Sequence, residues 1–144
     1  MEGKTMFKTT VMIEWGDCDE AGIVFYPNYF YWFDSAFQRF LRAHGLSQRE
    51  IRKRFGTVTP IVQAHADFKA PARYDDELDI RVTIRGDGER RFRIDYHLES
   101  GGKVIATGHE VRAWAKVAAD GGLKGAPVDP EFLSILGATG EMAP

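Results

Sequence analysis

The chain has 144 residues, 44% of them hydrophobic, and we expect one globular domain over residues 1–144 with a core of its own. A formal net charge of −2 gives no general attraction to nucleic acid or to an anionic membrane. Cys18 is the only cysteine, which excludes an internal disulfide and fits a reducing compartment. No apolar run resembles a signal peptide or approaches membrane-spanning length, so we expect a cytoplasmic protein.

The first half of the chain predicts a strand, a loop and a long helix. Residues 6–15 are rich in apolar and β-branched types, which favours a strand. Pro27 suits the first turn of a helix because its missing N–H would be unbonded there, and Gly45 is a typical stop. Residues 28–43 place their apolar side chains on one broad half of this helix. A face that wide predicts a helix wrapped on its inner side by a sheet.

The rest of the chain reads mainly as strands. Residues 47–55 predict a helical turn that carries a candidate mobile flap. Alternating patterns predict strands over residues 57–70, 78–85, 91–99 and 103–117. Ala64, Ala66 and Phe68 are expected to place one face of the first of these on the core, and Pro60 indicates an edge or strand-entry position. Short glycine turns make the last three an antiparallel meander. Asp129 and Pro130 begin a short terminal helix.

This order of elements predicts an α+β fold, with one helix packed against a curved antiparallel sheet. One helix covers only one face of such a sheet. The other face or an edge strand must then find another partner, so we expect a homodimer or a larger assembly.

The loop before the long helix is the strongest candidate for a site. Its carboxylates, Asp17 and Asp19, precede free backbone N–H groups at a helix start, where partial positive charge gathers. Such N–H groups can polarise a carbonyl oxygen while a carboxylate acts on its carbon. The alternative is that both residues only shape the turn. Asp34, at the border of the apolar half of the helix, either faces water or is an acceptor lining a pocket.

Residues 16–29 (Gly-Asp-Cys-Asp-Glu-Ala-Gly-Ile-Val-Phe-Tyr-Pro-Asn-Tyr) resemble the signature of hotdog-fold acyl-CoA thioesterases, and most closely that of the 4-hydroxybenzoyl-CoA thioesterase family. The similarity continues at residues 32–34, 59–62, 66–68 and 74–76, and so covers about residues 10–115. It implies a hotdog fold, in which a curved five-stranded antiparallel sheet wraps around one long central helix. It also implies hydrolysis of CoA thioesters of an aromatic, 4-hydroxybenzoyl-like acid or of a short acyl group.

The resemblance assigns roles to individual residues. Asp19 matches the catalytic carboxylate, which attacks the thioester carbonyl or activates water, and the backbone N–H of Tyr26 matches the donor to the thioester oxygen. Asp34 matches the residue that receives the phenolic hydroxyl, and Thr59 lies in a matching substrate-binding segment. A thioester is already activated toward acyl transfer, so a carboxylate and an oxyanion donor suffice. We therefore expect no metal and no cofactor, with coenzyme A belonging to the substrate.

Two departures from the family pattern affect these expectations. Pro27 stands where a broader bacterial branch has histidine, so histidine-assisted catalysis is not expected. Gly88, Glu89 and Arg90, followed by Arg91, stand where the 4-hydroxybenzoyl branch has a basic triplet that meets the nucleotide phosphates. Arg90 and Arg91 remain candidates for phosphate contact because guanidinium groups offer a fork of donors. The alternative is an ordinary charged strand face.

Other chemistries find little support in the sequence. The four histidines lack metal-ligand spacing, and no basic stripe with interleaved aromatics suggests nucleic acid. A hotdog hydratase or dehydratase would need a positioned histidine, and none lies between Asp17 and Tyr31. A non-catalytic module that binds acyl-CoA or a partner protein is the alternative from another class. The expected partners are an acyl-CoA substrate and further copies of the chain, as a homodimer or homotetramer, without nucleic acid or membrane.

Overall fold

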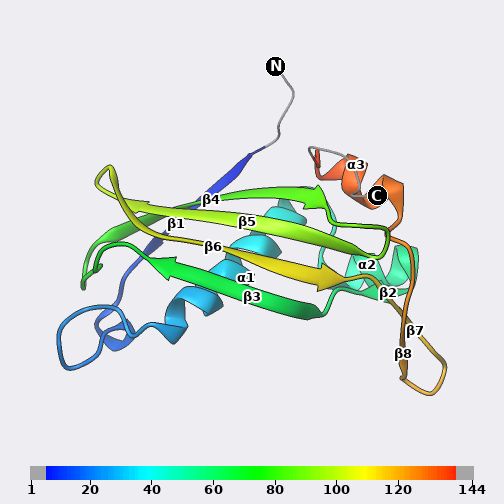
Figure 1. The fold of residues 1–144 in the computed structure, drawn as a ribbon, viewed down its shortest axis with the longest axis horizontal. Coiled ribbons are helices and arrows are strands. Elements are labelled where there is room, and N and C mark those ends of the chain that lie inside the picture. The colour runs from blue at the N-terminus through cyan, green and yellow to red at the C-terminus, as the bar shows by residue number, and fades with distance from the viewer. Residues whose placement is uncertain (1–5, 139–144) are drawn as a thin grey trace.

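The computed structural model describes residues 6–138, which form a five-stranded antiparallel sheet with a long helix across one face (Figure 1). The elements in chain order are β1 (Phe7–Met12), the 3-10 turn η1 (Trp15–Asp17), α1 (Pro27–Ala43), α2 (Gln48–Phe55), β2 (Thr57–Val58), β3 (Ile61–Phe68), β4 (Glu77–Gly86), β5 (Arg91–Ser100), β6 (Lys103–Ala113), β7 (Ala115–Val117), β8 (Leu123–Gly125) and α3 (Pro130–Ile135). The large sheet has the order β1-β4-β5-β6-β3, and β2, β7 and β8 form a smaller sheet. The hotdog architecture is confirmed.

Helix α1 packs its aromatic side against the sheet, as its apolar pattern predicts. Its buried residues are Tyr29, Trp32, Phe33, Ala36, Phe37, Phe40 and Leu41. The Phe33 ring stacks on that of Tyr96 in β5, with 4.5 Å between centroids. Gly108 in β6 permits this approach, because a Cβ there would lie 2.5 Å from both the Phe33 ring and the carbonyl oxygen of His65. The core therefore lies between α1 and the alternating buried residues of β4 and β5.

Several predicted boundaries differ from those of the structure. The first strand ends at Met12 instead of residue 15, because the backbone of Ile13 bonds to Asp75 and Asp76 and the chain then turns into η1. The predicted strand over residues 57–70 is two strands, β2 and β3, separated at Pro60, which has no N–H for a ladder. The strand over residues 103–117 likewise divides at Trp114 into β6 and β7, one in each sheet.

The segment after α1 is the short helix α2, which confirms the predicted helical turn. Ser47 caps α2 by accepting a 3.2 Å hydrogen bond from the N–H of Glu50. Ile51 and Phe55 are buried beneath it, and Gly56 ends it with a positive φ of 70°. Two turns anchored in this way fix the backbone of α2 against the core. The terminal helix α3 also starts as expected, with Asp129 accepting from the N–H of Glu131.

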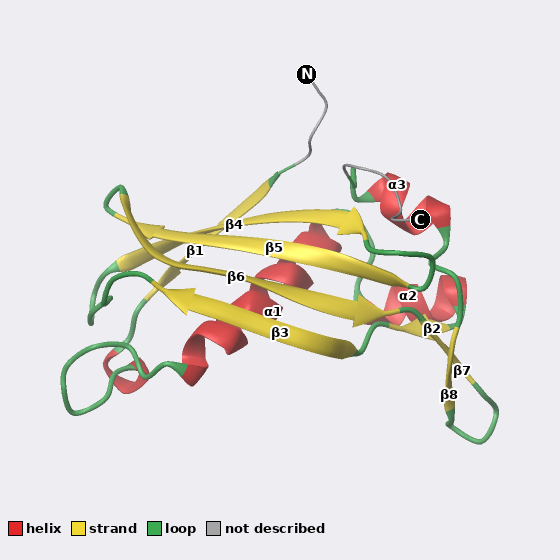
Figure 2. Ribbon diagram, in the orientation of Figure 1, coloured by secondary structure: helices red, strands yellow, loops and turns green. Residues whose placement is uncertain are grey.

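Strand β3 lies at the edge of the large sheet, and β6 is its one partner strand within residues 6–138 (Figure 2). Pro60 immediately precedes it, which confirms the predicted strand-entry position. The expectation that Ala64, Ala66 and Phe68 place one face on the core is wrong for the single chain, because only Ala66 is half-buried. An edge strand this exposed offers unpaired backbone groups to another chain. No helix within residues 6–138 has the length and apolar character to cross a membrane.

Candidate active site

Asp17 organises the loop that leads into α1. Its Oδ2 accepts a 2.8 Å hydrogen bond from the N–H of Glu14. Its carbonyl oxygen accepts from the N–H of Phe25 at 2.9 Å and from the side-chain amide of Asn28 at 2.8 Å. Asp17 therefore ties the loop to the first turn of the helix, which agrees with the interpretation that it shapes the turn.

Asp19 is exposed and keeps one carboxylate oxygen available. Its Oδ1 accepts a 2.9 Å hydrogen bond from the N–H of Ala21. Its backbone N–H donates to Ile23 and its carbonyl oxygen accepts from Gly22, whose φ of 80° closes the turn. Its Oδ2 has no hydrogen-bond or ion-pair partner in the described part of the chain. The loop thus fixes the orientation of the carboxylate and leaves an oxygen free for a substrate or a water molecule.

The backbone N–H of Tyr26 lies at the start of α1. Tyr26 is the N-cap residue, with φ −58° and ψ −32°, and Pro27 after it has no N–H. Within residues 6–138 the Tyr26 N–H has no hydrogen-bond acceptor, whereas the N–H of Phe25 is bonded to Asp17. The positive end of the helix dipole gathers at this position. A free donor there can hold a developing oxyanion.

An apolar pocket of about 470 Å³ opens beside Tyr26, at the N-terminal end of α1. Its lining includes Ile23, Val24, Tyr26, Tyr29, Phe68, Ala70, Pro71 and Ala72. The ring of Tyr26 lies 6.3 Å from that of Phe68 in the edge strand. A larger polar hollow of about 610 Å³ contains none of the predicted site residues and lies among paired charges such as Arg81 and Glu99. Of these two hollows, the apolar pocket is the one that adjoins a predicted site residue, Tyr26.

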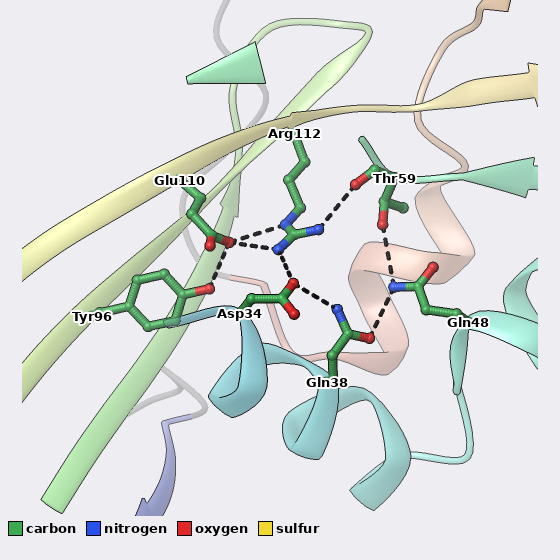
Figure 3. Close-up of polar contacts among 7 residues, drawn as sticks. All are labelled: Asp34, Gln38, Gln48, Thr59, Tyr96, Glu110 and Arg112. Carbon is green, nitrogen blue, oxygen red and sulfur yellow. Dashed lines mark hydrogen bonds and ion pairs between the residues drawn. The ribbon is translucent and has the colours of Figure 1, made fainter. Parts of the chain in front are cut away.

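Asp34 and Thr59 belong to a second group, a polar network joining α1, α2 and β6 (Figure 3). Asp34 Oδ1 accepts hydrogen bonds from Arg112 Nη2 at 2.8 Å and from Gln38 at 3.1 Å. Thr59 is buried, with its carbonyl oxygen accepting from Arg112 Nη1 at 3.0 Å and its hydroxyl accepting from Gln48 at 3.4 Å. Asp34 combines features of both predicted alternatives, an exposed carboxylate and an acceptor. One of its oxygens, Oδ1, is bound to Arg112, and its side chain is 45% exposed.

The buried side of the network surrounds Glu110. Its Oε1 accepts from the Tyr96 hydroxyl at 2.7 Å and from Arg112 Nε and Nη2 at 3.0 and 2.8 Å. Burial raises the pKa of the Glu110 carboxyl above its ordinary value, against the attraction of Arg112. Burial, and then the charge of Glu110, raise the pKa of the Tyr96 hydroxyl well above its ordinary value. Arg112 also lies over the Phe37 ring, 4.6 Å from its centroid.

Sequence reasoning missed Glu110, Arg112 and Tyr96 as parts of a site. One signal was present in β6, where Ala106, Gly108, Glu110 and Arg112 alternate and therefore point to the same face. Two charged residues in the alternating set of β6 that faces α1 indicate a buried ion pair. The partner on α1, however, is far away in the sequence.

Arg90 and Arg91 lie at the other end of the sheet from the Asp19 loop (Figure 1). Glu77, at the start of β4, pairs with Met12 near that loop, whereas Gly86 at the end of β4 leads into the turn before Arg91. Arg90 donates to the carbonyl oxygen of Gly125 at 3.5 Å and lies 3.7 Å from Glu89. The predicted site residues of one chain therefore lie in three separate places.

Comparison with known proteins identifies the family. The profile of the thioesterase-like superfamily matches residues 13–136. The chain belongs to this superfamily. It is 37% identical over 111 residues to 4-hydroxybenzoyl-CoA thioesterase of Pseudomonas sp. (strain CBS-3), which covers 72% of this chain and 78% of the relative. It is 31% identical over 101 residues to 1,4-dihydroxy-2-naphthoyl-CoA hydrolase of Synechococcus elongatus, covering 69% and 74%.

Solved structures agree with this assignment. A mutant of 4-hydroxybenzoyl-CoA thioesterase in complex with 4-hydroxybenzoyl-CoA matches with a TM-score of 0.82 and 30% identity, covering 91% of this chain and 98% of that one. A gentisyl-coenzyme A thioesterase matches with a TM-score of 0.75 and 35% identity, covering 90% and 98%. The resemblance to hotdog-fold acyl-CoA thioesterases is thus confirmed, and the protein is a thioester hydrolase of this superfamily.

Proposed function

We propose that this thioesterase hydrolyses CoA thioesters of hydroxylated aromatic acids, of which 4-hydroxybenzoyl-CoA is the representative, with Asp19 as the catalytic carboxylate. The observation that carries the proposal is that the segment leading into α1 holds both a free carboxylate oxygen, on Asp19, and a free N–H, on Tyr26 at the helix start. The names of the relatives support the aromatic class, because they act on hydroxybenzoyl, dihydroxynaphthoyl and gentisyl thioesters. Short acyl thioesters are the second class to test.

The chemistry needs only these groups. The Tyr26 N–H holds the thioester oxygen and stabilises the charge that develops there. Asp19 Oδ2 then either attacks the carbonyl carbon or takes a proton from an attacking water. In the first route the C–S bond breaks, CoA leaves as a thiolate and water later hydrolyses the mixed anhydride. In the second route the acid and the thiolate form directly. Either route consumes one water molecule and requires no metal and no cofactor.

Two features of the chain support a site built by two copies. Asp34 is two turns beyond Tyr26, about 12 Å along the helix axis, so one chain does not place both beside a short acyl group. The exposed edge strand β3 carries Ile61 and Val62, both 46% exposed, and can pair with β3 of a second copy. An antiparallel pair would set the Asp19 end of one chain beside the Asp34 end of the other. We therefore propose a homodimer, with a homotetramer as its further assembly.

In this dimer the free Oδ2 of Asp34 would accept the phenolic hydroxyl of the acyl group, while Thr59 supports the wall around it. The other oxygen of Asp34, Oδ1, already accepts hydrogen bonds from Arg112 and Gln38. An acceptor with a fixed direction favours hydroxylated rings, because an unsubstituted ring would leave it without a donor. We place this activity in the cytoplasm, in keeping with the single cysteine.

The test is the Asp19→Asn variant, assayed by thiol release with 4-hydroxybenzoyl-, benzoyl-, phenylacetyl- and acetyl-CoA. Asparagine keeps an oxygen for the Ala21 N–H but lacks the nucleophile or base, so we expect kcat to fall about 10²- to 10⁴-fold. Glu20→Gln, an exposed neighbour, is the matched control and should retain activity. Full turnover by Asp19→Asn would refute the mechanism. Binding of acyl-CoA without thiol release by the wild type would identify a binding module instead.

A further inference from the structure

Helix α2 presents a concentration of positive charge that the proposed chemistry does not use. Arg49, Arg52 and Lys53 line a hollow of about 470 Å³ together with Gln48 and Val58. All three cationic residues are exposed. The chain as a whole has a net charge of −2, so this cluster runs against the overall balance.

These cations have no carboxylate partners in the described part of the chain. Arg49, Arg52 and Lys53 take part in no ion pair within residues 6–138, whereas the neighbouring Arg54 lies 2.7 Å from Glu131. Three unpaired like charges on two turns of helix repel one another. An anionic ligand in the hollow would relieve that repulsion and satisfy their donors.

The hollow is preformed and rigidly supported. Beneath it Ile51 and Phe55 are buried, and Lys116 donates a 2.7 Å hydrogen bond to the carbonyl oxygen of Phe55 at the end of the helix. Binding an anion there therefore requires only the side chains of Arg49, Arg52 and Lys53 to become ordered.

The position of the hollow suits the far end of a CoA substrate. Helix α2 lies at the same end of the sheet as the Arg90 turn and away from the Asp19 loop (Figure 1). Gln48, which lines the hollow, donates to Gln38 at 3.0 Å, and Gln38 donates to Asp34 (Figure 3). These hydrogen bonds hold Gln48, and with it one wall of the hollow, in place.

The turn that the resemblance assigns to the nucleotide is poorly equipped for it here. Only Arg90 keeps a charge within the basic triplet, and Glu89 lies 3.7 Å from it. The guanidinium of Arg90 also donates to the carbonyl oxygen of Gly125. A carboxylate at this turn opposes a phosphate, and beside Arg90 the turn keeps the exposed Arg91, so it is less basic than the triplet of the family pattern.

We propose that Arg49, Arg52 and Lys53 form the binding site for the phosphate groups of the CoA nucleotide. Guanidinium groups bind phosphate oxygens in pairs, and the lysine ammonium adds a flexible third contact. This assignment rests on the proposed function for its ligand. The α2 site would take over the phosphate contacts that the turn at Arg90 has lost. It makes α2, and not the β4–β5 turn, the main determinant of affinity for the nucleotide.

The decisive experiment compares the wild type with the triple variant Arg49→Gln, Arg52→Gln, Lys53→Gln. Binding of adenosine 3′,5′-bisphosphate, measured by calorimetry, reads the site without any turnover. Each lost charged contact is worth about tenfold in Kd, so we expect at least that loss in the triple variant. Arg54→Gln, whose side chain is paired with Glu131, is the matched control and should bind as the wild type does. Equal Kd values for the wild type and the triple variant would overturn the assignment.

A second readout separates this site from the catalytic proposal. For a 4-hydroxybenzoyl thioester, the ratio of kcat/KM with CoA to kcat/KM with pantetheine should fall about tenfold in the triple variant, mainly through KM. A variant that only unfolds would lose both substrates together, and thermal melting detects it. If the wild type binds the bisphosphate through α2 yet hydrolyses no thioester, the catalytic proposal fails and the phosphate site stands. If Arg90→Gln alone abolishes bisphosphate binding, the phosphate site lies at the β4–β5 turn and not on α2.

Discussion

Arg112 Nη2 donates to Asp34 Oδ1 across 2.8 Å, joining strand β6 to helix α1 at the border between core and surface. The guanidinium is buried and is held from behind by Glu110, so it cannot rotate away. Asp34 keeps an oxygen free, and its side chain is 45% exposed. The buried ion pair therefore sets the direction in which the free oxygen of Asp34 points. A strand residue remote from the loop motif thereby acts on the acyl end of the proposed site.

The first prediction concerns selectivity. Asp34→Asn should lower kcat/KM for 4-hydroxybenzoyl-CoA about tenfold or more relative to benzoyl-CoA, because the acceptor for the phenolic hydroxyl loses its charge. Thiol-release assays with both substrates give the ratio directly. Ser35→Ala, one position along the same helix, is the control and should keep the ratio of the wild type. An unchanged ratio in Asp34→Asn would remove Asp34 from the acyl site.

The second prediction concerns the stability of the same network. Arg112→Met should destabilise the fold by about 3–5 kcal/mol, because Glu110 would remain buried with Tyr96 as its only side-chain partner. Urea unfolding followed by tryptophan fluorescence measures the change. The double variant Arg112→Met, Glu110→Gln should recover part of the loss, since the uncompensated charge is gone. A double variant as unstable as the single one would show that packing, and not charge, controls the cost.

Gly108 provides a test of how closely the helix approaches the sheet. In Gly108→Ala the added methyl group would meet the Phe33 ring and the carbonyl oxygen of His65 at 2.5 Å, so one of them must move. We expect a loss of about 1–3 kcal/mol, seen as a lower Tm. Gly125→Ala has nothing within 4 Å of its new methyl group and should leave Tm almost unchanged. Equal Tm values for the two variants would mean that the helix packs more loosely.

A fourth prediction concerns alkaline pH. Burial, and then the nearby Cys18, raise the pKa of Tyr29 from 10.0 to about 12. The unfolded chain therefore loses this proton at a lower pH than the folded one, so the stabilising contribution is complete below pH 10 and is lost as the pH rises toward 12. Two pKa units set an upper limit of roughly 3 kcal/mol on this contribution, which solvent screening lowers.

Urea unfolding at several pH values across this window measures the effect. Tyr29→Phe should show a shallower decline in the free energy of unfolding than the wild type. Tyr31→Phe, which changes a 69% exposed ring on the same helix, should decline as steeply as the wild type. Parallel curves for the wild type and Tyr29→Phe would show that the hydroxyl of Tyr29 is accessible in solution.

What could be predicted from the sequence is mainly what short segments determine. Pro27 at the first turn of α1, and the alternating strands β4 and β5, follow from local rules and are confirmed. Pro60 was expected at a strand entry, but the separate strand β2 before it was not predicted. The break at Trp114 was missed, because the chain moves there from one sheet to the other without a local signal. Those strands are distinguished by the sheet to which each belongs, which depends on contacts distant in the sequence.

The site shows the same division between local and distant contacts. Asp19 and Tyr26 lie close together in the sequence. The residues alone left the carboxylates of this loop as either a site or a turn, and the family resemblance assigned the roles of Asp19 and Tyr26. The contact of Asp34 with Arg112 links positions 78 residues apart, and no local pattern reveals such a pair. The exposure of Ala64 and Phe68 in β3 also differs from the prediction, which placed them on the core. Alternation can identify that strand, but it cannot tell whether its partner belongs to the same chain or to a second copy.

The edge strand supplies the last prediction. Val62 in β3 is 46% exposed, and Val62→Lys would place a charge where a second copy should pair. We expect sedimentation velocity to show monomers in place of dimers, and thiol release to fall together with the dimer because each site needs both chains. Leu123→Lys, at a 57% exposed position in β8, is the matched control and should remain dimeric. A Val62→Lys monomer with full turnover would place the whole active site within one chain, because β3 pairing would then contribute nothing to catalysis.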